Sequence, residues 1–212
     1  RSLVGSEMCI RDSFTKLDVK EEGGNLVLTA NYKLGNLDKA QWTIHPDGMA
    51  TLDYTYNFSG VVDLMGICFD YPEGQVLSKR WLGAGPYRVW QNRIHGTQYD
   101  IWENDYNDPI PGETFTYPEF KGYFGSVSWM SIRTKEGTIS LTNETPDSYI
   151  GVYQPRDGRD RLLYTLPESG ISVLNVIPPV RNKVNSTDLS GPSSQPKWVD
   201  GPQTGRLVLR FE

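Results

Sequence analysis

Residues that could act as nucleophiles or bases are few in this chain. The two histidines are His45, next to a predicted turn, and His95, in a glycine-rich stretch. Cys68 could pair with a histidine on paper, but it lies in the apolar segment 64–71, where a free cysteine is usually inert core. No Gly-x-Ser-x-Gly elbow is present. The sequence therefore gives little support to nucleophilic catalysis.

Acidic side chains suggest two further kinds of chemistry. One run could supply oxygen ligands to calcium, although it lacks the EF-hand order: Asp100, Glu103, Asn104, Asp105, Asn107 and Asp108. Glu103, Glu113 and Glu119 could serve as glycosidase carboxylates if two of them were held about 5–10 Å apart. Nothing in their spacing pairs them, and no CxxC or HxxxH spacing indicates zinc. We therefore predict no catalytic residue and no metal site.

Aromatic residues with polar neighbours are the usual material of sugar sites. A ring can stack on the apolar face of a pyranose while amide, carboxylate and guanidinium groups bind the hydroxyls. The segments 90–93 and 195–198 both have this composition. The alternative interpretation is structural, with Trp90 packed in the core and Trp198 anchoring a loop. Composition alone leaves both interpretations open.

Short strands are expected to position these residues. Apolar and polar residues alternate with the period of half-buried antiparallel strands in Asn25–Tyr32, Gln41–His45, Thr51–Asn57 and Arg206–Phe211. Pro46–Gly48 lies between two of these segments and predicts a hairpin turn. The stretches 83–96 and 179–205 resist the strand pattern and are predicted loops. No twelve-residue window has a convincing helical period, so we expect an all-β antiparallel sandwich.

Composition and charge exclude several classes of protein. The chain has 212 residues, a net charge of −5 and 12% aromatic residues, which is too aromatic for a disordered chain. The mild acidity argues against a nucleic-acid partner. No apolar run approaches the roughly 18 residues of a membrane helix, so no membrane partner is expected. Residues 1–13, which include Cys9, lack both a strand period and a signal-peptide core, so we predict a non-native or linker segment followed by one domain over 14–212.

A family resemblance rests on the run Trp81-Leu82-Gly83-Ala84-Gly85-Pro86, followed by Trp90, Asn92-Arg93 and Gly96. This run resembles the signature of the C-terminal domain of glycoside hydrolase family 2 β-galactosidases. The resemblance extends over about residues 14–212, through flanking segments at 64–69, 117–122, 127–129 and 207–211. The chain departs from the family in three positions, where the family often has Glu, Tyr and Asp: Arg88, Trp90 and Asn92.

The resemblance implies a fold and a set of site residues. The fold would be a large antiparallel β-super-sandwich of the galactose-mutarotase type, incomplete at its N-terminus, and hence with exposed sheet edges. The signature residues, with a structural role, would be Trp81, Gly83, Gly85, Pro86, Trp90 and Arg93. A family loop at the rim of the sugar pocket would correspond to 191–196. The family tryptophan of that loop falls at Gln195, so Ser194, Gln195 and Trp198 are the implied substrate-binding residues.

The resemblance also implies a role in a parent enzyme. The parent would hydrolyse terminal β-galactosides with retention, using two glutamates of a TIM barrel earlier in the chain. This segment would pack on that barrel and rim the sugar pocket, without hydrolytic activity of its own. Its partners would be the barrel, the β-galactoside and, through the parent, further copies. No cofactor is expected in this segment, although Mg²⁺, Na⁺ or Ca²⁺ can serve the parent. The parent would reside in the bacterial cytoplasm or periplasm.

Two other functions remain open at this point. A stand-alone carbohydrate-binding β-sandwich would need a complete set of strands and its own exposed aromatic platform. A mutarotase-like or lyase-like enzyme would need a histidine or a carboxylate pair that converges in a cleft, and the chain has only two histidines.

Overall fold

The computed structural model describes residues 14–33, 36–69, 71–105, 122–145, 147–152, 170–179 and 191–212. Its strands are β1 (Phe14–Glu22), β2 (Asn25–Tyr32), β3 (Leu37–Ile44), β4 (Met49–Asn57), β5 (Gly60–Val62), β6 (Met65–Phe69), β7 (Val76–Gly85), β8 (Gln98–Asp105), β9 (Phe124–Gly125), β10 (Trp129–Thr134), β11 (Thr138–Asn143), β12 (Tyr149–Val152), β13 (Ile171–Val176), β14 (Lys197–Val199) and β15 (Pro202–Phe211). Two short 3₁₀ turns, η1 (Glu73–Gln75) and η4 (Pro192–Ser194), complete the elements. Within these residues no helix has the length and apolar character needed to cross a membrane.

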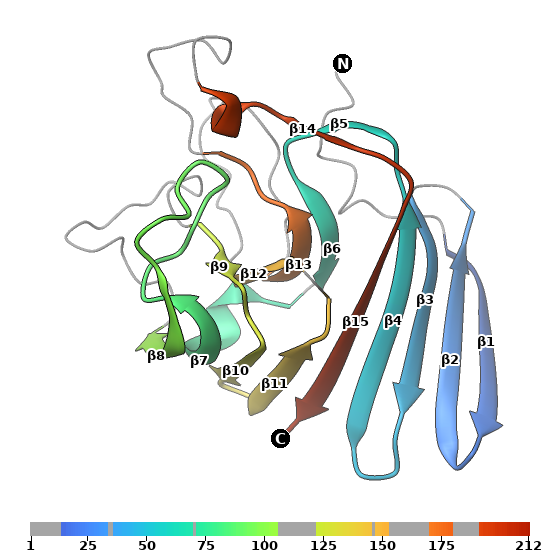
Figure 1. Ribbon diagram of the computed structural model, residues 1–212. Helices are drawn as coiled ribbons and strands as arrows, with labels where there is room; N and C mark the ends of the chain where they lie inside the picture. Colours follow the sequence, from blue (N-terminus) through green and yellow to red (C-terminus); the bar gives the residue numbers. More distant parts are fainter. Residues whose placement is uncertain are drawn as a thin grey trace.

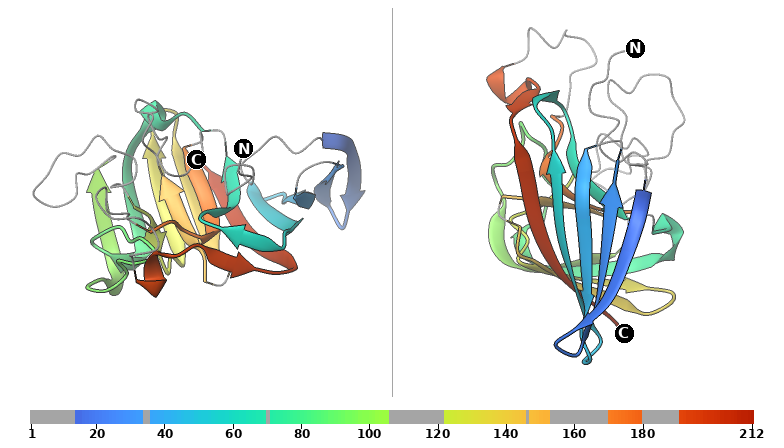
Figure 2. Two further views of the ribbon diagram at one scale, coloured as in Figure 1. Left: turned by 90° about the horizontal axis from the view of Figure 1, so that it is seen from above. Right: turned by 90° about the vertical axis from the view of Figure 1, so that its right-hand side faces the viewer.

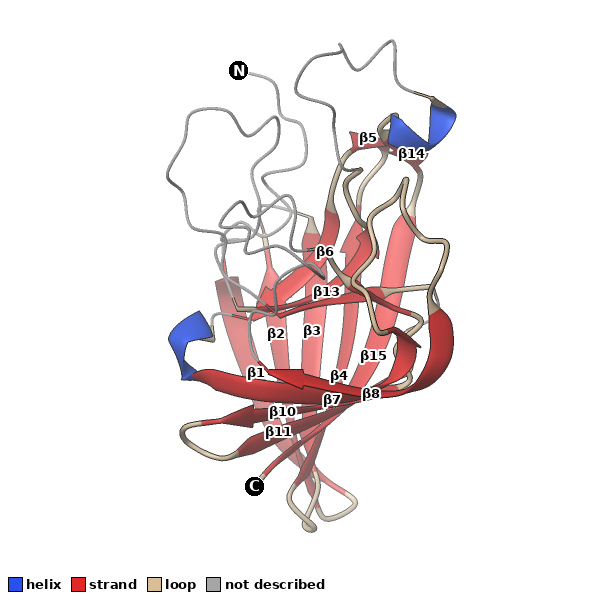
Figure 3. Cartoon of the chain, turned by 90° about the vertical axis from the view of Figure 1, so that its left-hand side faces the viewer, coloured by secondary structure: helices blue, strands red, loops and turns tan. Residues whose placement is uncertain are grey.

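Three antiparallel sheets make up the described part of the chain. The largest has nine strands in the order β1-β2-β3-β4-β15-β11-β10-β7-β8, and a four-stranded sheet has the order β6-β13-β12-β9. The ribbon β14-β5 extends beyond one end of the large sheet (Figure 1). The large sheet twists strongly, so that β7 and β8 cross the direction of β3 and β4 (Figure 3). The predicted all-β antiparallel class is confirmed.

The predicted strands and the predicted turn are found in the structure. The four alternating segments coincide with parts of β2, β3, β4 and β15, except that His45 lies one residue past the end of β3. The turn at Pro46–Gly48 joins β3 to β4, with a hydrogen bond from His45 N to Met49 O of 2.8 Å. Gly48 adopts a φ of +84°, which a residue with a side chain rarely adopts. The hairpin prediction is therefore confirmed in its position and in its reason.

Both predicted loops contain strand that the sequence pattern concealed. In the first, β7 continues through Gly83 and Gly85, which pair with Asp100 and Gln98 of β8. In the second, the described part includes β14 and the start of β15. Gly83 and Gly85 were part of a predicted loop, whereas in the structure they allow close packing within a strand. A Cβ atom on Gly85 would lie 2.4 Å from Cδ1 of Trp102, closer than atoms can approach.

One cross-strand row of side chains forms the centre of the core. It crosses six neighbouring strands of the large sheet through the paired residues Ala50, Leu209, Leu141, Met130, Trp81 and Trp102. The four-stranded sheet packs against this row with Phe124, Ile150 and Val173, each at most 1% exposed. The Trp81 and Phe124 rings meet edge to face at 4.7 Å between centroids. The row is buried between the two sheets, and we call the strands β15, β11, β10 and β7, whose inner face is covered in this way, the closed end of the large sheet.

The cover of the large sheet ends near β3. Trp42 of β3 contacts Phe69 of β6 edge to face at 6.3 Å, and the hairpin of β1 and β2 extends past this contact (Figure 2). The alternation continues on the same face, but Leu17 is 48% exposed and Val19 is 56% exposed. We call the hairpin of β1 and β2 the open end of the large sheet. Its exposed face agrees with the expectation of exposed sheet edges.

Candidate functional site

The resemblance-bearing residues of β7 are mostly buried. Trp81 is fully buried and its Nε1 donates to Ala84 O at 3.1 Å. A Cβ on Gly83 would lie 3.0–3.1 Å from backbone atoms of residues 125–127. The peptide between Gly85 and Pro86 is cis, and Pro86 is exposed. Trp81 and the two glycines therefore shape the end of β7 from which the following loop leaves.

The loop that follows β7 is closed by contacts of its own. The Trp90 and Arg93 backbones bond each other in both directions, with Arg93 N donating to Trp90 O at 2.9 Å. Val89 pairs with Tyr123 in the same way. The Trp90 ring is 6% exposed and lies against Gly122, whose Cβ would be 3.0 Å from Cζ2 of the ring. Trp90 is thus unavailable to stack on a sugar, whereas Arg93 is exposed.

The central feature of the site is a junction between two loops about one hundred residues apart. Gln91 Nε2 donates to Gln195 O at 2.7 Å, and Asn92 Nδ2 donates to Ser194 Oγ at 2.8 Å. Gln91 N also donates to Pro178 O at 3.1 Å. We call these four residues, Gln91, Asn92, Ser194 and Gln195, the loop junction. Figure 1 shows the loop after β7 (green) reaching the turn η4 (red) at the end of the molecule that carries β14.

The loop junction is built to hold its position. Two backbone hydrogen bonds, from Ser194 N to Gly191 O at 2.9 Å and from Gln195 N to Pro192 O at 3.2 Å, close the turn η4. Ser194 is 9% exposed. Gln91 Oε1 is buried and accepts no hydrogen bond from the described residues, although buried polar atoms are usually paired. The junction therefore contains one buried acceptor that no described group satisfies.

Trp198 is the exposed aromatic side chain next to this junction. It lies in β14 opposite Val61 of β5, and the two side chains are 70% and 47% exposed. Ser59 Oγ donates to Asp200 Oδ1 at 2.6 Å and accepts from Gly201 N at 3.2 Å, which fixes the base of the ribbon. This exposure favours the interpretation of Trp198 as an available aromatic surface over its interpretation as a loop anchor. Its ring is presented to solvent beside an apolar neighbour.

Sequence reasoning identified some of this site and missed the rest. Trp90, Asn92 and Arg93 were singled out as sugar-type composition, and Ser194, Gln195 and Trp198 came from the resemblance. The structure brings Asn92 and Ser194 into contact and leaves Trp90 buried and Arg93 exposed at the margin. The pairing of Trp198 with Val61 was not predicted. Only the strand period of the short segments at 60–62 and 197–199 could have suggested it, and three residues are too few for a period.

The other candidate residues do not assemble into a catalytic group in the described part of the chain. Cys68 is half-buried and disulfide-bonded, so it offers no free thiol. His45 Nε2 bonds Thr51 Oγ1 at 3.0 Å, and His95 is exposed in the loop after β7. Cys9 lies outside the described residues.

The acidic candidates of β8 are divided between the two faces of that strand. In β8, Asp100 and Glu103 project to opposite faces because side chains alternate along a strand. No group of three or more potential metal ligands occurs in the described ranges. The remaining acidic and amide candidates, Asn107, Asp108, Glu113 and Glu119, lie outside the described residues.

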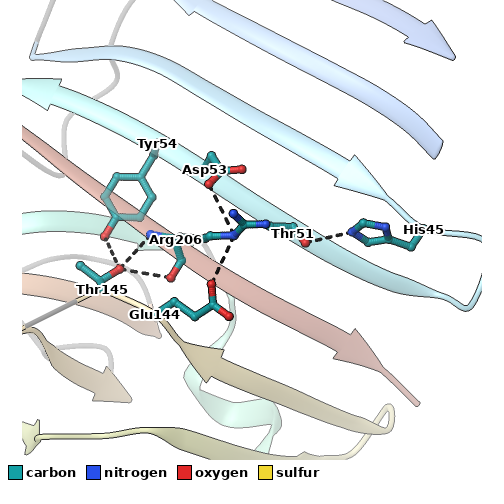
Figure 4. A network of polar contacts seen from close by, with 7 residues as sticks. All are labelled: His45, Thr51, Asp53, Tyr54, Glu144, Thr145 and Arg206. Carbon is teal, nitrogen blue, oxygen red and sulfur yellow. Dashed lines mark hydrogen bonds and ion pairs between the residues drawn. The ribbon is translucent and has the colours of Figure 1, made fainter. Parts of the chain in front are cut away.

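A polar cluster on the outer face of β4 and β15 is structural (Figure 4). Arg206 Nε lies 3.3 Å from Glu144 Oε2 and 3.7 Å from Asp53 Oδ1, and all three side chains are about half exposed. Such surface ion pairs contribute about 0–1 kcal/mol. Thr145 Oγ1 donates to Arg206 O at 3.2 Å and accepts from Arg206 N at 3.0 Å. The cluster thus fastens the segment after β11 to β15.

Burial shifts the ionisation of three tyrosines. It raises the pKa of Tyr54 and Tyr56 above the ordinary value of 10.0, and the neighbouring Tyr54 raises that of Tyr56 further. Burial also raises the pKa of Tyr149, with a smaller contribution from Asp147. Tyr56 OH donates to Asn175 Oδ1 at 2.5 Å, and Tyr54 OH lies 3.5 Å from Thr145 Oγ1. These phenols therefore stay neutral and serve the core.

Comparison with known proteins adds little to this geometry. No protein-family model matches the chain. No curated protein sequence matches it either. A solved structure that resembles it is that of the GalM/aldose epimerase homologue from C. elegans, at 8% sequence identity and a TM-score of 0.40, over 93% of this chain and 69% of that one. At this level of similarity the comparison assigns no role to any residue here. The fold and the site define an antiparallel β-sandwich with docked loops and an exposed tryptophan.

Proposed function

We propose that this chain is the C-terminal β-sandwich region of a β-galactosidase-like enzyme of glycoside hydrolase family 2. It would be a galactose-mutarotase-type super-sandwich, and in the parent it would pack on the catalytic barrel and rim the sugar pocket. The residue run Trp81–Pro86 with its context is the basis of the family resemblance. The parent would hydrolyse terminal β-galactosides with retention, and its paired glutamates lie in the barrel.

The loop junction is the observation that carries this proposal. The resemblance marks two separate stretches, the signature with its following loop and the rim loop before the last strand. The hydrogen bonds from Gln91 to Gln195 and from Asn92 to Ser194 join these two stretches. A rim loop needs a fixed position, since only a preorganised contact selects among ligands without a large ordering cost. In the proposed function, the loop junction supplies this fixed position for the rim loop.

The substrate-binding role is assigned to three residues of the rim. Trp198 would stack on the ring of the bound sugar or its aglycone, because it is the exposed ring nearest in sequence to the junction. Ser194 and Gln195 would orient the loop that carries it. Contacts of this kind change which sugar is accepted more than the rate of the chemical step, since only interactions that strengthen in the transition state raise kcat. The signature residues Gly83, Gly85 and Pro86 would act through the shape of β7.

A second function, a stand-alone carbohydrate-binding module, is favoured by one observation. Trp198 and Val61 form an exposed apolar pair on a short ribbon, and such a platform can bind a sugar without a second domain. The two functions differ in where the binding energy lies. A module holds a complete site, whereas a rim holds part of one.

A titration with galactose and lactose, followed by tryptophan fluorescence, separates the two functions. For a rim region we expect no saturable change at high millimolar sugar in the wild-type chain. A saturable change that disappears in Trp198→Ala and persists in Trp129→Phe would instead establish the binding module. The family assignment has its own test in the coding sequence upstream. A frame that continues into a barrel with paired glutamates supports the assignment, and a frame without one contradicts it.

A further inference from the structure

Strand β1 forms one edge of the nine-stranded sheet. Among the described strands it pairs with β2 alone, and all nine of its residues are exposed. Such an edge presents unpaired backbone N–H and C=O groups along one side and is a template for another strand. A bulge between Phe14 and Lys16 limits the regular part of the edge to residues 16–22.

The two faces of β1 have different chemistry. The outward face carries four charges in strict alternation of sign: Lys16, Asp18, Lys20 and Glu22. Lys16 Nζ lies 2.5 Å from Asp18 Oδ1, and Lys20 Nζ lies 2.7 Å from Glu22 Oε2. The hydrogen bond and charge of Lys20 lower the pKa of the Glu22 carboxyl. The opposite face carries the exposed Leu17, Val19 and Glu21.

We propose that β1 is a self-association edge, on which β1 of a second copy of this chain pairs antiparallel with Val19 opposite Val19. In this register Lys16 faces Glu22 of the second copy, and Asp18 faces Lys20 of the second copy. Every outward pair then joins opposite charges, which favours a cross-strand pair. The interface is isologous, because a two-fold axis passes between the two Val19 residues.

The charge pattern selects this register over its neighbours. A pairing centred on Asp18 would place Lys16 opposite Lys20 and Asp18 opposite itself. A pairing centred on Lys20 would place Asp18 opposite Glu22 and Lys20 opposite itself. Both create like-charge pairs, which are destabilising. The register centred on Val19 is the longest that has none, and on the opposite face it places Val19 opposite Val19 and Leu17 opposite Glu21.

The other edge of the sheet lacks this property. Strand β8 pairs with β7 alone among the described strands, but its charged residues, Asp100, Glu103 and Asp105, are all acidic. Any antiparallel pairing of β8 with itself therefore places acidic residues near one another with no cation to balance them. The second copy is expected on β1 and not on β8.

Complementary charge variants test this pairing. The acidic variant carries Lys16→Glu and Lys20→Glu, and the basic variant carries Asp18→Lys and Glu22→Lys. In a homodimer of either variant all four outward pairs become like-charge pairs, so we expect dimerisation at least about tenfold weaker than in the wild type. An equimolar mixture restores four opposite-charge pairs, and we expect a heterodimer. Lys39→Glu makes the same charge reversal on the inner strand β3 and is the control.

Sedimentation velocity over about a hundredfold range of chain concentration gives the readout. The proposal predicts a wild-type and Lys39→Glu dimer, two monomeric variants and a heterodimer in their mixture. A wild-type chain that stays monomeric throughout would overturn it, and so would variants that dimerise as well as the wild type. Circular dichroism of each variant checks that the fold is retained, and a mixture of two folded variants that fails to associate also overturns the register.

Discussion

The two ends of the nine-stranded sheet carry the same alternation of apolar and polar residues, but only the closed end has its apolar face covered. At the closed end, Trp81 and Leu207 are fully buried beneath the four-stranded sheet. At the open end, Leu17 and Val19 follow the same alternation and remain about half exposed. A period of two therefore identifies the face of a strand that suits burial. Whether that face is covered depends on strands elsewhere in the chain. The closed end holds the loop junction, and the open end offers an edge to a second copy.

Truncating one side chain at each end gives the largest expected contrast. We expect Trp81→Ala to lower the free energy of unfolding by about 3–5 kcal/mol, because it leaves a cavity beside Phe124. Leu17→Ala should cost less than about 0.5 kcal/mol, because little of that side chain is buried. Urea denaturation followed by circular dichroism measures both. Similar losses in the two variants would mean that the open end is covered in solution.

Adding one methyl group to a glycine sharpens the view of the closed end. In Gly85→Ala the new Cβ would lie 2.4 Å from the Trp102 ring, so β8 must shift, at a cost of about 1–3 kcal/mol. Gly74→Ala is the matched control, since its Cβ would meet no atom within 4 Å. The same denaturation experiment applies. Equal stability of Gly85→Ala and the wild type would contradict the tight packing of Trp102.

Alkaline pH provides a probe of the buried tyrosines, two of which lie in the covered part of β4. The folded chain keeps Tyr54 and Tyr56 protonated where the unfolded chain ionises them, because burial raises both pKa values. The stability that these phenols contribute is complete below about pH 10 and is lost as the pH rises further. We expect the melting temperature to fall above pH 10, and to fall less steeply in Tyr56→Phe. Melting curves followed by circular dichroism test this, and identical slopes in the two chains would contradict it.

Removing one hydrogen bond of the loop junction should have the smallest and most local effect. Asn92→Ala deletes the donor to Ser194 Oγ, which we expect to destabilise the junction by about 1 kcal/mol. Amide exchange in residues 191–196 should then accelerate, while exchange in β15 stays unchanged. Arg93→Ala alters the exposed neighbour and serves as the control. Unchanged exchange in Asn92→Ala would show that the two loops are held by other contacts.

The sequence predicted local structure better than tertiary contacts. The alternation in 25–32 and 51–57 and the turn at Pro46–Gly48 depend on neighbouring residues, so they were visible. The strand character of Gly83 and Gly85 was not, because it depends on space taken by Trp102 and by residues 125–127. The open end at β1 was equally invisible in the pattern, since Leu17 alternates as regularly as Leu207.

The candidate site was predictable in its parts and not in its assembly. Composition identified Trp90, Asn92 and Trp198 as suitable for sugar binding. It could not say that Trp90 turns into the core while Trp198 turns to solvent, because burial depends on Gly122 and on the pairing of β14 with β5. The junction of Asn92 with Ser194 joins residues 102 positions apart. No local period reports a contact at that separation.

Hydrogen–deuterium exchange across the large sheet tests most directly whether its two ends differ in stability. At a concentration where the chain is monomeric, the account predicts slow exchange in the paired amides of β15, β11, β10 and β7. It predicts faster exchange in β1 and β2, through local opening that leaves the closed end folded. Protection of β1 and β2 equal to that of β15 would contradict the account, because the open end would then unfold only with the whole domain.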